Sequence, residues 1–277
     1  MSATLVSDIL AGDATAASAI GRPDLYAPLM AGKNGVLPIL GSSRKIEAGL
    51  AYGVDSAVVY MMPAMSSGRN ACPGASDGCI DVCLVVSGQM GHMNAVVARR
   101  RKQAAFFADR NAFFCQLYGE VKSRAANAVK NGKIPAYRVN GVTDWTYWRM
   151  PFTLDGVSYP SIVHALPDVQ FYEYTKKRLS AQGAIPSNLH LTFSYSERPD
   201  ADERAAEYLQ AGHNVAVVTF GKKHDIPAEW TIGGVSYPTV DGDLHDARFL
   251  DPKGHVVILA AKGRATTDTS GFVQKVA

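Results

Sequence analysis

The 277-residue sequence has few charged residues, no long apolar run and only four cysteines. Charged side chains make up 19% of the chain, below the usual quarter, so long disordered charged segments are not expected. The net charge of +3 neither demands nor excludes a nucleic-acid partner. Hydrophobic residues nevertheless make up 47%, which is enough for a sizeable core in a single domain over residues 1–277.

The N-terminal residues lack the basic start and the continuous apolar run of a secretory signal peptide. No stretch reaches the roughly 18 uninterrupted apolar residues that a membrane span needs. We therefore expect a cytoplasmic protein with no membrane partner. Disulfides are rare in that compartment, so clustered cysteines there point to metal or redox chemistry.

The order of apolar runs predicts the secondary structure. Residues 1–53 are expected to form an irregular lead-in, because glycine and proline recur there. A strand is expected at 55–62, a helix at 94–130 with a break near Arg110, and a helix at 200–211. Five further β-leaning runs are found in the second half of the chain, at 136–140, 169–174, 189–195, 214–220 and 255–260.

Alternation of apolar strands with helices predicts an α/β fold with a mostly parallel sheet. Six or more such strands favour a partial or irregular β/α barrel, and a doubly wound sheet is the alternative. Segments 153–160 and 231–238 resemble each other, and each has a glycine-containing turn between β-formers. This pattern predicts two tight hairpins inserted between the barrel elements, unless the similarity is coincidental turn chemistry.

The most informative segment is the loop at 63–93, where Cys72, Cys79 and Cys83 lie within twelve residues. Thiolates bind zinc and iron–sulfur clusters. Four-cysteine zinc sites usually pair two short knuckles, and this chain has no second one. Three sulfurs from one loop suit a cuboidal 4Fe–4S cluster, in which each iron takes one protein ligand. We therefore expect an iron–sulfur cluster, with zinc or unligated thiols as alternatives.

Cys115 is the candidate fourth ligand of this metal centre. It lies on the long expected helix beside two phenylalanines, where a buried structural cysteine is also common. If Cys115 is not a ligand, one iron stays open to a substrate oxygen, water or another side chain. An open iron of this kind can act as a Lewis acid.

In β/α barrels, functional side chains collect at the carboxyl ends of the strands. Applied to the expected strands, this rule selects four candidate substrate-binding residues, namely Arg138, Asn140, Lys176 and Lys262. Asp144, Asp243 and His245 are the candidate catalytic acid–base groups. The last two come from segment 241–246, which could instead be a turn whose aspartates cap backbone groups.

These residues predict an enzyme acting on a small anionic or phosphorylated substrate, of the hydrolase or lyase type if one iron is open. Two alternatives remain. The first is a non-enzymatic metal protein that contacts nucleic acid or a host partner through the basic run 99–102, which otherwise reads as the solvated face of a helix. The second is a zinc-dependent hydrolase.

Several segments resemble the bacteriophage and actinobacterial family called gene product 88. The similarity covers most of the chain from about residue 50, and the cysteine loop is its most specific part. Its segments are 67–102, 140–144, 169–176, 191–194, 241–246, 251–252 and 261–263. The resemblance implies a phage or bacterial setting, hence the host cytoplasm for a phage gene, and supplies no reaction.

The loop also differs from that of radical S-adenosylmethionine enzymes, which share cysteine-rich loops and partial barrels. Their loop reads C-x3-C-x2-C, whereas the spacing here is C-x6-C-x3-C. On spacing alone, we do not expect that chemistry.

Overall fold

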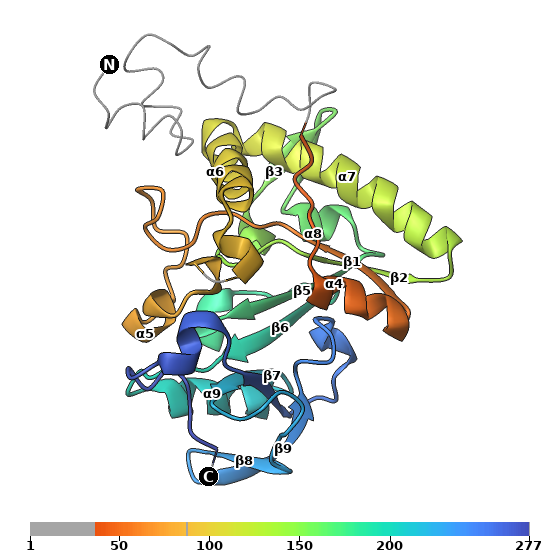
Figure 1. Cartoon of the computed structure of the whole chain (residues 1–277). Coiled ribbons are helices and arrows are strands. Elements are labelled where there is room, and N and C mark those ends of the chain that lie inside the picture. Colours follow the sequence, from red (N-terminus) through yellow and green to blue (C-terminus); the bar gives the residue numbers. More distant parts are fainter. Residues whose placement is uncertain (1–36, 87, 277) are drawn as a thin grey trace, which may run out of the picture.

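The structure is a computed structural model that describes residues 37–86 and 88–276. Its centre is an eight-stranded sheet in the order β1-β2-β5-β6-β7-β10-β9-β8 (Figure 1). Every neighbouring pair is parallel except β8 and β9. The strand bounds are Val54–Val58 (β1), Ile134–Arg138 (β2), Gln170–Thr175 (β5), Leu189–Ser194 (β6), Asn214–Thr219 (β7), Glu229–Ile232 (β8), Val235–Asp241 (β9) and Val256–Ala260 (β10). The expected α/β class with a mostly parallel sheet is confirmed.

The central strands form where the apolar runs predict them. β7 and β10 pair in register from Val215 with Val256 onwards, and most of their side chains are buried. Such nearly continuous apolar strands are typical of parallel sheets, because both faces of the sheet are covered. Apolar side chains on both faces therefore hold the strand ends at fixed positions.

The long expected helix is present as two helices, α6 (Met93–Ala108) and α7 (Arg110–Lys130). Asp109 is extended between them, and its carboxylate accepts a hydrogen bond from Ala112 N at 2.9 Å. This side-chain cap starts α7, so the break falls where the sequence predicts it. Phe114 and Leu117 of α7 are fully buried in the core.

The shorter helices connect the strands. Four of them are α-helical, namely α4 (Arg44–Glu47), α5 (Asp77–Asp81), α8 (Ile162–Ala165) and α9 (Ala201–Gln210). The 3-10 helices are η2 (Ala48–Tyr52), η3 (Leu84–Val86), η4 (Gly88–Gly91), η5 (Tyr147–Arg149), η6 (Leu179–Gln182), η7 (Arg248–Leu250) and η8 (Gly263–Thr267). Within the described part of the lead-in, α4 and η2 therefore precede β1, while residues 1–36 lie outside the described residues. None of the described helices is long and apolar enough to cross a membrane.

Both expected hairpins are present, but only one is an insertion. β3 (Phe152–Leu154) and β4 (Val157–Tyr159) form a separate two-stranded sheet. In contrast, the β8–β9 hairpin extends the main sheet, because β9 pairs in parallel with β10. The two central turn residues have positive φ in each hairpin, 50° and 79° at 155–156 and 56° and 80° at 233–234. This geometry is the reason for the glycines in both turns.

The basic run on α6 differs from the solvated face expected from the sequence. Arg99 and Lys102 are buried, with exposed fractions of 3% and 8%. Arg99 donates hydrogen bonds to Met90 O at 2.7 Å and Val85 O at 3.4 Å, so it packs beneath the segment that follows the cysteines. Arg101 donates to Pro38 O. The four residues therefore do not form a continuous exposed basic patch.

Candidate metal and ligand site

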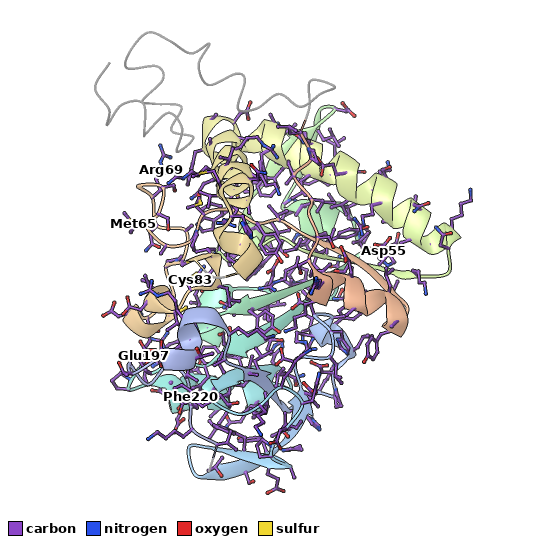
Figure 2. All side chains as sticks on the ribbon, in the orientation of Figure 1. Asp55, Met65, Arg69, Cys83, Glu197 and Phe220 are labelled. Carbon is purple, nitrogen blue, oxygen red and sulfur yellow. The ribbon has the colours of Figure 1, made fainter. Side chains whose placement is uncertain are left out.

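The three clustered cysteines line one cavity of about 440 Å³ at the carboxyl ends of the parallel strands. Figure 1 shows that α5 and the C-terminal segment lie on the same side of the sheet, and Figure 2 places Cys83 and Glu197 on that side, far from Asp55 of β1. Five of the seven acid–base and substrate-binding residues predicted from the sequence line the same cavity, namely Arg138, Asp144, Lys176, Asp243 and Lys262. The rule about strand ends therefore brought together most of the residues that it selected.

The cysteine loop is fixed by residues that follow β6. The Glu197 carboxylate accepts hydrogen bonds from Ser76 Oγ and from Gly78 N, both at 2.8 Å. Arg198 donates to Ala75 O at 2.7 Å. Because Ser76 is the N-cap of α5, the carboxylate also lies at the positive end of the short helix that carries Cys79.

Two glycines allow the loop to lie this close to the strand ends. A Cβ atom at Gly74 would lie 2.6 Å from Asp144 Oδ2 and 3.1 Å from the Lys176 carbonyl carbon. A Cβ atom at Gly78 would overlap Ser270 Oγ and lie 2.9 Å from the Glu197 carboxyl carbon. A side chain at either position would therefore displace these neighbours, since real Cβ atoms do not approach so closely.

The thiols lie near one another in a partly desolvated environment. Burial raises the pKa of Cys72 to about 12; a hydrogen bond from Ala64 N opposes this shift, and Asp144, Cys79 and Cys83 add to it. Burial likewise raises the pKa of Cys79 and of Cys83, while Lys176 lowers both. At neutral pH the thiols are therefore neutral when no metal is bound. A metal must displace their protons to bind.

The spacing of the thiols bears on the kind of metal centre to expect. Among the described residues, no three His, Cys, Asp or Glu side chains converge closely enough to hold one metal ion. A cuboidal cluster differs in this respect, because each thiolate binds its own iron. Cys115 does not line the cavity. Its sulfur contacts Thr153 O of β3 at 3.2 Å.

Asp144 and Lys176 form the polar wall nearest the thiols. Asp144 Oδ2 accepts a hydrogen bond from Lys176 N at 3.1 Å, whereas its Oδ1 is buried and meets no hydrogen-bond donor. Burial raises the pKa of Asp144, although Lys177 opposes the shift. The Lys176 ammonium donates to Ser194 O, Ser194 Oγ and Tyr195 O. Over the described part of the chain, no carboxylate forms an ion pair with Lys176.

Other charged groups of the cavity lining form ion pairs. Lys262 Nζ lies 2.5 Å from Asp243 Oδ1, and this contact keeps the pKa of Asp243 low despite burial. Arg138 lies 3.1 Å from Asp246, which in turn lies 3.8 Å from Lys45 Nζ. Burial alone would lower the pKa of Arg138, but Asp246 and Glu173 raise it. The candidate cations are therefore already neutralised in part.

The sequence profile of the Gene product 88 family matches residues 38–276. The chain belongs to this family. Neither a curated protein nor a solved structure gives a significant match to it. The matched range contains every residue that lines the cavity.

Two candidate residues of the Gene product 88 chain lie outside the cavity lining. Asn140 donates to Trp145 O at 2.7 Å and accepts from Thr143 Oγ1 at 2.8 Å, so its side chain shapes the turn after β2. His245 packs edge-on against Tyr52 and contacts Arg248 Nη2 at 3.2 Å. Burial, with help from Arg248, lowers the pKa of His245 to about 4, so its ring is neutral at pH 7. Neither side chain therefore lines the cavity, and the binding and catalytic roles expected of these two residues stay predictions.

The catalytic and binding residues predicted from the sequence do not include three charged groups that lie at or beside the cavity. Lys45 and Asp246 line the cavity, and Glu197 anchors the loop. Asp246 lies in the acidic segment and Glu197 follows a strand end, so both carried a weak sequence signal. Lys45 carried none, because it lies in the lead-in and reaches the cavity only through the folding of α4 beside β1. Burial lowers the pKa of Lys45 to about 8.

Proposed function

We propose that this Gene product 88 protein binds a 4Fe–4S cluster through Cys72, Cys79 and Cys83. The observation that carries the proposal is that all three thiols line one cavity. The N–H groups of Ala64 and Val85 stabilise the thiolates of Cys72 and Cys83, as backbone donors do around cluster sulfurs. A cluster suits this wall better than zinc, because no three ligands converge on one point in the described structure.

We further propose that the protein is an enzyme for a small anionic ligand. Cys115 lies against β3 rather than in the cavity, which leaves one iron open toward the ligand space. An open iron polarises a bound oxygen as a Lewis acid. Asp144 is the proposed acid–base group beside the cluster, because it lines the cavity and burial raises the pKa of its carboxyl group. Asp243 and Lys262, which form an ion pair in the cavity lining, would orient the ligand.

Two finer features belong to this proposal. The strand order supports curvature of the sheet into a partial β/α barrel, because neighbours in the chain are neighbours in the sheet from β1 through β7. The four free cysteines suit a reducing, cytoplasmic setting. A nucleic-acid partner has less support than a small ligand, since Arg99 and Lys102 are buried.

The deciding experiment is purification without oxygen, followed by absorption spectroscopy with iron, sulfide and zinc analysis. We expect a brown protein with broad absorbance near about 400 nm and roughly four irons per chain. Cys83→Ser should lose most of the iron, whereas Cys115→Ala is the matched control and should keep it. A colourless wild-type protein holding one zinc would refute the cluster, as would a Cys83→Ser variant with full iron content.

A further inference from the structure

We propose that the cavity binds S-adenosylmethionine, with the amino-acid end of this sulfonium nucleoside at the open iron and its amino group beside Asp144. The inference rests on the proposed cluster and names a ligand for it. This ligand carries a carboxylate, but its sulfonium and ammonium groups make its net charge positive, so it replaces the small anionic ligand proposed above. It concerns binding of the intact molecule. It also revises the expectation drawn from cysteine spacing, because binding of this kind requires three thiols around one cavity and an open iron rather than a particular spacing.

The arrangement of the strands supports the inference. The thiol loop follows β1, the edge strand, and the cavity extends from there across the ends of β2, β5, β6, β7 and β10. The site is therefore elongated along the sheet, with the thiols gathered at the loop. A volume of about 440 Å³ lies within the range of pockets that enclose a cofactor-sized molecule.

The unpaired oxygen of Asp144 identifies the charge of the missing partner. Asp144 is 7% exposed, its Oδ1 has no donor, and its charge raises the pKa of Cys72, so this carboxylate lies close to the thiols. A buried carboxylate oxygen without a donor is costly, and a ligand ammonium would satisfy it. A plain phosphate or carboxylate ligand would instead be repelled at this point. The group beside the cluster is therefore cationic.

A carboxylate next to the ammonium group of the proposed ligand also fits the part of the cavity lined by Lys176. The buried Lys176 ammonium donates its three hydrogens to neutral oxygens, so no ion pair in the described structure neutralises its charge. A ligand carboxylate would be attracted by this charge without receiving a hydrogen bond from the ammonium. An ammonium facing Asp144 and a carboxylate facing Lys176 together define an α-amino acid. Such a group can reach the open iron through both its nitrogen and its carboxylate oxygen.

The rest of the cavity suits a nucleoside. Val218 and Leu259, near the ends of β7 and β10, contribute an apolar lining together with Phe272 of the C-terminal segment. Phe272 also lies 4.6 Å from the Lys176 Nζ, so the ring is next to the amino-acid wall. An apolar surface of this kind accepts the face of an adenine ring, whereas a free amino acid would leave it uncovered. This difference favours the adenosyl compound over methionine.

The test uses the full chain reconstituted without oxygen and reduced with dithionite. Equilibrium dialysis measures binding of S-adenosylmethionine, and electron paramagnetic resonance reports whether the ligand changes the cluster. We expect about one molecule bound per cluster and a changed resonance spectrum. Asp144→Asn should keep the iron content and weaken binding about 10- to 100-fold, as expected for a lost hydrogen bond between charged groups. Asp168→Asn, at an exposed carboxylate outside the cavity, should bind as the wild type does.

Each outcome is decisive. A protein with a full cluster that neither binds S-adenosylmethionine nor changes its spectrum overturns this inference and leaves the proposed cluster intact. A protein without a cluster overturns both. If methionine alone binds as tightly as the adenosyl compound, the nucleoside part of the inference is wrong. Should Asp144→Asn lose its iron, the wild-type dialysis and spectrum still decide the question.

Discussion

Glu197 provides the sharpest test of how the fold holds the cysteine loop. Its carboxylate receives Ser76 Oγ and Gly78 N at 2.8 Å each, and no other side chain is hydrogen-bonded to Gly78 N in the described structure. Replacing Glu197 with Ala removes both hydrogen bonds. Replacing it with Gln keeps an oxygen that accepts from Gly78 N, and the amide N–H₂ can donate to Ser76 Oγ, but both hydrogen bonds lose the carboxylate charge. The two variants should therefore weaken the loop by different amounts.

The expected size follows from the contacts. Hydrogen bonds to charged groups contribute about 1.5–3 kcal/mol each, and the lower end applies because Glu197 is only partly buried. Glu197→Ala should then cost about 3 kcal/mol of local loop stability, and Glu197→Gln about half of that. Each 1.4 kcal/mol changes an equilibrium tenfold, so transient opening of the loop should increase about 100-fold in the first variant and about tenfold in the second.

The assay is the rate at which a ferrous chelator removes iron from the reconstituted protein, with urea unfolding as a separate measure of global stability. Glu229 offers a matched control, because it accepts a hydrogen bond from Ser236 Oγ at 2.7 Å on the β8–β9 hairpin, away from the cavity. Glu229→Ala should not change the chelation rate. If Glu197→Ala loses iron no faster than the wild type, the loop is held in some other way and the reasoning is wrong.

Further predictions concern the same site and its supporting core. Gly78→Ala should also accelerate iron loss, by the equivalent of about 1–3 kcal/mol, since its methyl group would overlap Ser270 Oγ; chelation kinetics would measure this. Because burial raises the thiol pKa values, cluster reconstitution followed by absorbance should be less complete at pH 6 than at pH 8. Burial also raises the pKa of Glu173 from 4.5 to about 7, so the folded state binds more protons than the unfolded state between those values. Stability should therefore fall as pH rises through this window, and urea unfolding of Glu173→Gln should lack that decline.

The sheet and its long helices could be predicted because their signals are local. Apolar runs marked β1, β2, β5, β6, β7 and β10, and the break between α6 and α7 fell beside a residue that can cap a helix. The strand-end rule then required only that parallel strands share one edge. With that edge fixed, Arg138, Asp144 and Lys176 were brought to one cavity without any knowledge of side-chain contacts.

The remaining features depend on contacts between distant segments. Lys45 reaches the cavity from the lead-in, and Asp246 comes to it from beyond β9. The basic run on α6 was expected in solvent, but Arg99 turns inward to the carbonyl groups of Val85 and Met90. The inward orientation of Arg99 depends on the path of the cysteine loop. This path cannot be predicted from the sequence of α6 alone.

Lys176 connects the electrostatics of the fold to the chemistry of the proposed cluster. The ammonium is 8% exposed, its three donors meet neutral oxygens at the end of β6, and its charge favours the ionised forms of Cys79 and Cys83. A bound cluster becomes more negative when it is reduced, so a buried cation nearby stabilises the reduced form. Lys176→Met should therefore lower the reduction potential. A lost interaction of about 1.4 kcal/mol corresponds to about 59 mV for a one-electron couple.

The measurement is a potentiometric titration of the reconstituted variant, with Lys177→Met as the control. Lys177 lies next in the chain but donates to Thr146 Oγ1 and does not line the cavity. Its substitution should shift the potential less. An unchanged potential in Lys176→Met, with full iron content, would mean that this charge is screened from the cluster. The lysine would then serve only to tie the end of β5 to the end of β6.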